Sequence, residues 1–165
     1  MTNKIKFKRG DNLIKYGKAY KVIKIKNGVL FYKPYFKKKK DNSLVCSIPA
    51  ENIENNYIRK PISNYQLNKL IKKILYKKGR IVQTNIIKIK ASLGKNKIGK
   101  TLKVVKKLWL EQKDKDKTMA KSKKNAYKQA RQQVIEEISL ARNISLAKAK
   151  LVLDRALEKG LEFSL

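Results

Sequence analysis

The sequence predicts an α+β protein of two domains, a small β-barrel or strongly bent sheet followed by a compact all-α helical domain. Two observations predict this order. Apolar residues alternate with a period of two before Pro61, and they recur at helical spacing after it. The length of 165 residues leaves room for one or two small domains. Because Pro61 disfavours helix in the residue before it, we expect the domains to span residues 1–62 and 63–165.

Five short strands are expected in the first domain. The Asn27-Gly28 pair is the strongest short signal for a hairpin, because both residues tolerate a positive φ. Pro34 predicts that its strand lies at an edge or contains a bulge, and Pro49 ends the fourth strand. Four consecutive lysines at 37–40 predict a solvated loop. The strands are expected at 12–16, 19–26, 29–36, 43–48 and near 52–57.

Capping residues divide the second domain into helices. Ser63 is a candidate N-cap, Asn143 breaks a long helix, Ser145 caps the last helix and Gly160 is expected to stop it. Residues 85–93 are ambiguous between helix and strand, because the period of a short apolar run cannot decide between them. The other helices are expected at 63–77 (ended by Gly79), 98–112, about 122–142 and 145–159, with a loop at 113–124.

The charge of the chain is extreme and uneven. The sequence has 43 basic and 12 acidic residues, a net charge of +31, which is typical of proteins that bind polyanions. Only 6 of the basic residues are Arg, so part of the charge is also explained by a compositional bias of the source genome. Residues 55–110, however, contain 16 Lys and Arg and no acidic residue. This local absence of acids favours a real polyanion-binding surface at the start of the helical domain.

Several functional classes are excluded by composition. The chain has no histidine, which excludes zinc-type sites and histidine acid–base catalysis. Its one cysteine, Cys46, rules out an internal disulfide framework and is expected to be a small buried hydrophobe in a reducing cytosol. The first ten residues lack the apolar core of a signal peptide, and no apolar run is long enough to span a membrane. We expect a cytoplasmic protein without a cofactor.

Residues 94–101, GKNKIGKT, match the P-loop pattern, in which Lys100 would contact phosphates and Thr101 would hold Mg²⁺. The surrounding sequence does not support this interpretation. About 70 residues follow Gly94, which are too few for a doubly wound sheet, and no second βα unit is visible. Asp154, which imitates the acidic strand of such enzymes, lies in a helical pattern. A nucleotide-hydrolysing enzyme is therefore not expected.

Several segments resemble a known family in the same order. The segments "SIPAEN" and "IRKPIS" within residues 43–63 resemble the CarD/CdnL family of bacterial transcription regulators, whose first domain is shared with transcription-repair coupling factors. "FKRGDNLIKYGKAYKVIKI" at 7–25 is similar to its opening strands. "VVKKLW" at 104–109 and "NAYKQARQQVIEEISLARNISLAKAKLVLDRAL" at 125–157 are similar to its C-terminal helices. The resemblance covers nearly the whole chain.

The resemblance implies a fold and a function. The first domain would be a Tudor-like (SH3-like) barrel that grips the β subunit of RNA polymerase, and the protein would act as a monomer without catalytic activity. The helical domain would lie on promoter DNA at the upstream edge of the melted bubble and stabilise the open complex. Polymerase contacts are expected from the barrel strands, at Lys26, Tyr32, Lys33 and Ser47.

The chain departs from the family at the DNA wedge. The family has a tryptophan near the start of the second C-terminal helix, but residues 80–85 contain none. Trp109 lies on the apolar stripe of a later helix and is expected in the core. Ile81, Val82 and Ile86 are the aliphatic candidates for a wedge, because such side chains can also part base steps. DNA contacts are expected from Arg80, Val82, Ile86, Lys88, Lys90, Lys95 and Lys97.

A second class of function stays open at this stage. A basic nucleoid- or ribosome-associated protein without a polymerase partner would show the same net charge. Association with the polymerase β subunit distinguishes the two, since the second class requires nucleic acid alone.

Overall fold

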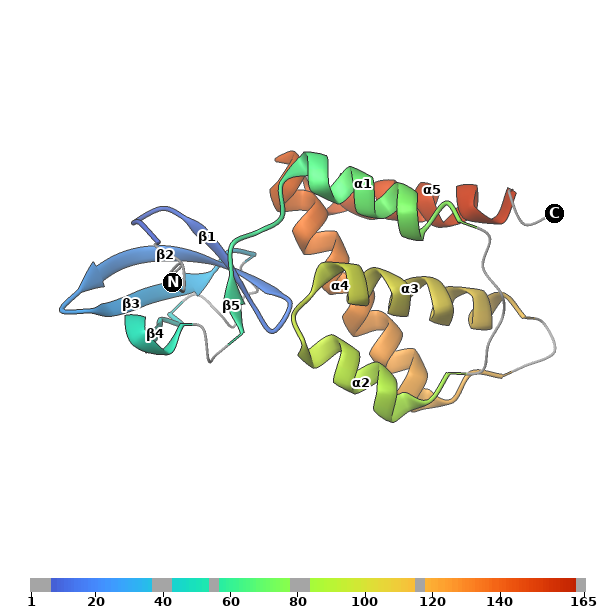
Figure 1. Cartoon of the computed structure of the whole chain (residues 1–165), viewed down its shortest axis with the longest axis horizontal. Coiled ribbons are helices and arrows are strands. Elements are labelled where there is room, and N and C mark those ends of the chain that lie inside the picture. The colour runs from blue at the N-terminus through green and yellow to red at the C-terminus, as the bar shows by residue number, and fades with distance from the viewer. Residues whose placement is uncertain (1–6, 37–42, 54–56, 78–83, 115–117, 163–165) are drawn as a thin grey trace. The chain divides into compact units, whose positions relative to one another are not determined.

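The computed structural model describes residues 7–36, 43–53, 57–77, 84–114 and 118–162. It divides the chain into two compact units, Met1–Pro61 and Ile62–Leu165. The first unit carries the strands and the second the helices (Figure 1). The expected α+β organisation, with strands first and helices after them, is confirmed.

The first unit is a curled antiparallel sheet with the strand order β4-β3-β2-β1-β5. The Asn27-Gly28 hairpin joins β2 to β3, and its two residues have φ values of 49° and 71° as the turn requires. Pro34 is the last residue of β3, where a missing N–H disturbs the ladder least. The strands are β1 (Asn12–Lys15), β2 (Lys18–Lys26), β3 (Val29–Pro34), β4 (Cys46–Pro49) and β5 (Ile58–Arg59).

Two expectations for the sheet need correction. The bulge lies in β2, between Val22 and Lys24, and not at Pro34; β3 is an inner strand. The fifth strand is β5 at Ile58–Arg59, whereas a short 3₁₀ turn, η2 (Ala50–Asn52), occupies the start of the expected 52–57 strand. The lysine run at 37–40 lies outside the described residues.

One face of the sheet forms the core of the first unit. Tyr32, Leu13 and Leu30 are at most 1% exposed, and the Tyr32 ring meets Tyr20 edge to face at 5.2 Å. Cys46 is only partly buried beside this cluster, so it is less enclosed than expected. The buried members are Phe7, Leu13, Val22, Leu30, Tyr32, Ile48, Ile53 and Ile58.

The second unit contains five helices in the described ranges, and their ends follow the capping residues closely. The Ser63 hydroxyl accepts the Gln66 backbone N–H at 3.3 Å, and Ser145 does the same for Lys148 at 3.2 Å. Asn143 ends the long helix in the left-handed conformation, with φ of 51°. The helices are α1 (Asn64–Ile74), α2 (Ile86–Gly94), α3 (Ile98–Lys113), α4 (Lys121–Arg142) and α5 (Leu146–Glu162).

Two helix ends differ from the sequence expectation. The first helix, α1, ends at Ile74, before Gly79, which lies outside the described residues. The last helix, α5, continues through Gly160 to Glu162. The ambiguous 85–93 segment is a helix, α2, which begins where the Asn85 side chain accepts the Ile87 N–H at 2.8 Å.

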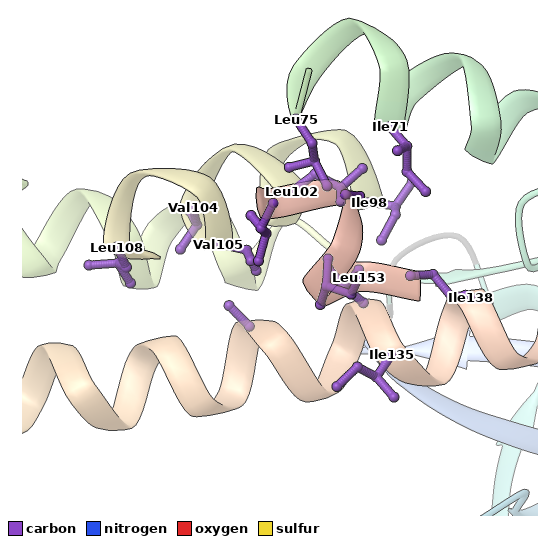
Figure 2. Packing of buried hydrophobic residues seen from close by; sticks show 14 of the residues in the cluster. Ile71, Leu75, Ile98, Leu102, Val104, Val105, Leu108, Ile135, Ile138 and Leu153 are labelled. Carbon is purple, nitrogen blue, oxygen red and sulfur yellow. The ribbon is translucent and has the colours of Figure 1, made fainter. Parts of the chain in front are cut away.

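Helix α4 is the centre of the second unit, because it packs against each of the other four helices. Figure 2 shows Ile135 and Ile138 of α4 with Leu153 of α5 and the apolar residues of α1 and α3. The leucine and valine side chains at the centre, such as Leu102 and Val105, are 0% exposed. Helix α4 thus supports α2 and α3, which carry most of the exposed lysines described next.

Candidate nucleic-acid interface

A buried carboxylate fixes the chain just before α2. Glu111 of α3 is 7% exposed, and its Oε2 accepts the Thr84 hydroxyl at 2.7 Å. The Lys123 ammonium of α4 meets its Oε1 at 2.5 Å. Burial by itself would raise the pKa of Glu111, but the hydrogen bonds from Lys123 and Thr84 outweigh it and lower that pKa. Glu111 therefore stays ionised and holds the start of α2 against α3 and α4.

Helix α2 has a buried side and an exposed side. Ile89 and Leu93 face the core, and Ile86 is half-buried against it. Ile87, one position further, is 72% exposed in the first turn of the helix. Lys90 lies three residues beyond Ile87 and is exposed on the same face. The outer side of α2 thus combines an aliphatic side chain with ammonium groups.

The turn between α2 and α3 holds a cluster of lysines. Asn96, in the left-handed conformation with φ of 49°, reverses the chain between Lys95 and Lys97, and both lysines are exposed. The neighbouring Lys95 lowers the pKa of Lys100, and burial, Lys97 and Lys103 act in the same direction. The positive charges of Lys95, Lys97 and Lys103 thus disfavour the charged form of Lys100, and an anion such as a phosphate nearby would oppose this effect.

Four of the seven expected DNA-contact residues are exposed in this region. Lys88 and Lys90 lie on α2, and Lys95 and Lys97 lie in the α2–α3 turn. The basic face is defined here as these four residues together with Lys100 and Lys103. Arg80 and Val82, like Ile81, lie outside the described residues.

The two isoleucines at the start of α2 have different surroundings. Ile86, the residue expected from the sequence, is half-buried against the core, whereas Ile87, which was not among the expected residues, projects into solvent. The missed signal was the spacing of Ile86, Ile89 and Leu93, which places Ile87 on the opposite side once the segment is known to be a helix. Lys100 and Lys103 were also missed as members of the face.

The P-loop look-alike does not have the local structure of a P-loop. A helix, α2, precedes it where nucleotide-binding folds have a strand. Thr101 is 3% exposed, and its hydroxyl donates to the Lys97 carbonyl at 3.4 Å, so it does not face a ligand. The glycines serve as the end of α2 and the start of α3. Within the described ranges no group of three or more His, Cys, Asp or Glu side chains gathers to hold a metal.

Three of the four expected polymerase-contact residues lie on one face of the sheet. Lys33 and Phe31 alternate along β3 with buried residues and so face away from the core. Ser47 is the partner of Phe31 across β3 and β4, and Lys26 is the partner of Val29 across β2 and β3. Paired residues share a face, so Lys26, Lys33 and Ser47 belong to the same outer surface. Lys26 and Ser47 are exposed, and Lys33 is partly buried.

Tyr32 lies on the opposite side of the sheet. It is 1% exposed, and its hydroxyl oxygen accepts a hydrogen bond from the Lys15 ammonium at 2.8 Å. The aromatic ring fills the core, so Tyr32 does not lie on the outer face with the other three residues. The position of Tyr32 follows from the alternation of side chains along β3, because Lys33 faces outward and its neighbour in the strand must face inward.

Residues 79–154 match the family model described as CarD, C-terminal domain. This match supports membership of the chain in the CarD/CdnL family. The matched segment includes α2, α3, α4 and the first half of α5, and every member of the basic face lies within it. No curated protein matches the chain.

The match also indicates a general role. The CarD C-terminal domain suggests a CarD-like transcription regulator, and the family implies a partner in the transcription machinery. The family acts in regulation and not in catalysis. Among the helices that the structure describes, none is long and apolar enough to cross a membrane.

Proposed function

We propose that this protein binds the β subunit of RNA polymerase through its first unit. Its helical unit then stabilises the open promoter complex by contacting DNA at the upstream edge of the melted bubble. The observation that carries this proposal is the basic face. It gathers exposed lysines in a segment without acidic residues, and this segment lies within the CarD C-terminal domain. Promoter DNA is the polyanion that such a transcription regulator meets.

The DNA contacts are proposed to be mainly to phosphates. Lysine ammonium groups on a helix and a turn carry charge but no base-specific pattern of donors and acceptors. Ile87 supplies the apolar side chain that parts base steps in minor-groove proteins, in place of the family's tryptophan. It is exposed in the same helix as Lys88 and Lys90, so a wedge and phosphate contacts are available together.

The polymerase contact is proposed at the outer face of β2, β3 and β4. We take the curled sheet to be a Tudor-like module whose outer face includes Lys26, Lys33 and Ser47. The ammonium of Lys24 lies 4.8 Å from the centre of the Phe31 ring on this face, which gives it both charge and apolar area. β4 is also the last strand of the sheet on that side, and an edge strand can pair with a strand of a partner.

We further propose that the protein acts as a monomer in the cytoplasm, associated with the nucleoid through polymerase and promoter. A basic nucleic-acid-binding protein without a polymerase partner is the competing function, and the net charge of +31 favours it equally. Capture of the purified β subunit by the full chain, in nuclease-treated samples, distinguishes the two. Charge reversal at Lys26 and Lys33 should abolish capture, whereas the competing function requires no capture at all.

The central experiment is the decay of open complexes after a competitor challenge. Binding to the polymerase gives the helical unit a high effective concentration near one stretch of DNA, so weak contacts become effective. They shift the equilibrium only by the difference in their strength between open and closed states. A difference of about 1.4 kcal/mol lengthens the lifetime tenfold. The intact protein should therefore slow the decay without a comparable rise in initial promoter affinity.

A charge variant tests the role of the basic face. Changing Lys88, Lys90, Lys95 and Lys97 together to Ser should remove the slower decay while polymerase capture persists. If each of these four lysines contacts one phosphate, the salt dependence of duplex binding should also weaken. The slope of the logarithm of the binding constant against the logarithm of the salt concentration should become less negative by about 3.6. A matched control replaces four exposed lysines outside the face, at Lys69, Lys72, Lys148 and Lys150, and lowers the net charge equally. An equal loss in both variants would contradict the assignment of the face.

A further inference from the structure

A groove of about 610 Å³ opens between α3, α4 and α5, apart from the basic face. It contains none of the residues that define that face. Its lining combines two aromatic side chains, Trp109 and Tyr127, with four cationic ones and two carboxylates. The charged residues are Lys113, Lys124, Lys128, Arg131, Asp154 and Glu158.

The aromatic part of the groove is held firmly. Trp109 and Tyr127 are both partly buried and pack against the main helical core with one edge while the other lines the groove. Burial raises the pKa of the Tyr127 phenol, so it stays neutral and can donate a hydrogen bond. The Lys113 ammonium lies 5.7 Å from the centre of the Trp109 ring. A flexible lysine is easily displaced from this ring by a flat apolar group.

The groove has an excess of cationic groups, four against the carboxylates of Asp154 and Glu158, and this excess favours an anion. The first turn of α4 carries Lys121, Lys123 and Lys124, at the helix end where the dipole disfavours cations. Lys123 is neutralised by Glu111, and Arg131 by Asp154. For Lys124 and Lys128 the described residues provide no carboxylate within ion-pair distance. The buried Nε of Arg131 also lacks a hydrogen-bond partner among the described atoms.

We propose that this groove binds an unpaired nucleotide of single-stranded DNA. The base stacks on Trp109 and Tyr127, and the flanking phosphates bind Lys124 and Lys128. An aromatic platform beside a cationic track is the combination by which proteins hold single strands without reading their sequence. Displacement of Lys113 from the indole by the base frees its ammonium for a third phosphate.

This inference goes beyond the proposed function, since it requires neither polymerase nor the basic face. Trp109 is the only tryptophan of the chain, so its fluorescence reports on the groove directly. We expect a thymidine dodecamer to quench the emission of the full-length protein in a saturable manner. An abasic strand of the same length, a duplex and free thymidine monophosphate should each quench far less at equal concentration.

Two variants and one control complete the test. Lys124→Ser with Lys128→Ser should weaken the binding that the quenching titration measures. The slope of the logarithm of the binding constant against the logarithm of the salt concentration should become less negative by about 1.4, the value for two phosphates of a single strand. Tyr127→Leu keeps an apolar side chain of similar bulk and should weaken binding about tenfold, because one stacking partner is lost. Lys88→Ser with Lys90→Ser removes the same charge from the basic face and should leave the titration unchanged.

Other outcomes would overturn the proposal. Equal quenching by the abasic strand would show phosphate attraction without stacking. Binding of the free mononucleotide as tightly as the strand would rule out a strand groove. Equal weakening by the two double-lysine variants would mean that the groove has no role of its own. The two proposals can fail separately. Intact quenching without open-complex stabilisation would contradict the proposed function alone, and open-complex stabilisation without quenching would contradict this inference alone.

Discussion

A Cβ atom on Gly160 would lie 2.1 Å from the carbonyl oxygen of Leu75. This glycine sits inside α5 and allows it to approach the backbone at the end of α1 (Figure 1). Glycine normally weakens a helix interior by about 0.5–1 kcal/mol relative to alanine. Here the close contact between two backbones requires it, because no side chain fits between them.

Gly160→Ala should therefore destabilise the protein although alanine favours helix. A contact of 2.1 Å with a backbone atom forces α5 or α1 to move, and overpacking of this kind costs about 1–3 kcal/mol. Thermal unfolding followed by circular dichroism measures the effect. Gly99→Ala is the matched control, since its Cβ would meet Leu70 at an ordinary 3.7 Å. A variant at Gly160 as stable as the control would show that the helices do not pack this closely.

The Gly160 contact also shows where sequence reasoning succeeds and where it ends. Local rules located the helix boundaries set by Ser63, Asn143 and Ser145, because a cap depends on neighbours within a few residues. The same local rules predicted that the last helix ends at Gly160, but α5 continues to Glu162. Its real role depends on Leu75, which is far away in sequence, and no local pattern contains that information.

Some residues of the candidate site could likewise be predicted from the sequence, and others required the structure. Charge patterning found Lys88, Lys90, Lys95 and Lys97, because a segment without acids is visible in the sequence alone. The choice between Ile86 and Ile87 required the segment to be identified as a helix, and a nine-residue apolar run could not decide that. The groove beside Trp109 joins three helices and was beyond the reach of the sequence.

Glu111 should make stability depend on pH in the acidic range. Its pKa is lowered from 4.5 in the folded state, so the unfolded chain binds the proton more tightly. The stabilisation is complete above pH 4.5 and is lost as the pH falls through the lower pKa of the folded protein. Glu111→Gln should flatten the stability profile below pH 4.5 and reduce stability at neutral pH, because the partly buried Lys123 loses its counter-charge. Urea unfolding at several pH values tests this, with Glu136→Gln as the control.

The start of the helical unit should be Ile62 and not the first residue of α1. The Ile62 N–H donates to Oε1 of Glu137 at 3.1 Å, and that glutamate is 2% exposed. A fragment of residues 62–165 should fold with helical circular dichroism. A fragment that begins at Asn64 loses this bond and the Ser63 cap, which is worth about 1 kcal/mol. Equal unfolding midpoints for the two fragments would contradict this boundary.

The P-loop look-alike should perform no nucleotide chemistry. Thr101 is buried and bonded to Lys97, and Lys100 belongs to the basic face, where neighbouring lysines lower its pKa. ATP should show no saturable binding in equilibrium dialysis at physiological salt. Lys100→Ala should weaken duplex DNA binding slightly and leave the ATP result unchanged. Saturable micromolar ATP binding that this substitution abolishes would contradict the structural assignment.

Ile86 and Ile87 should give opposite phenotypes although they are neighbours. Ile86 is half-buried against the core, so Ile86→Ser should lower the unfolding midpoint by removing apolar packing and placing a hydroxyl beside it. Ile87 is 72% exposed, so Ile87→Ser should leave stability nearly unchanged. If Ile87 is the wedge, the same substitution should shorten the open-complex lifetime towards that without the protein, while Ile87→Leu should retain most of the effect. Thermal unfolding and competitor-challenged decay, measured on the same preparations, separate the two roles. An unchanged lifetime with Ile87→Ser would assign the stabilisation to phosphate contacts alone.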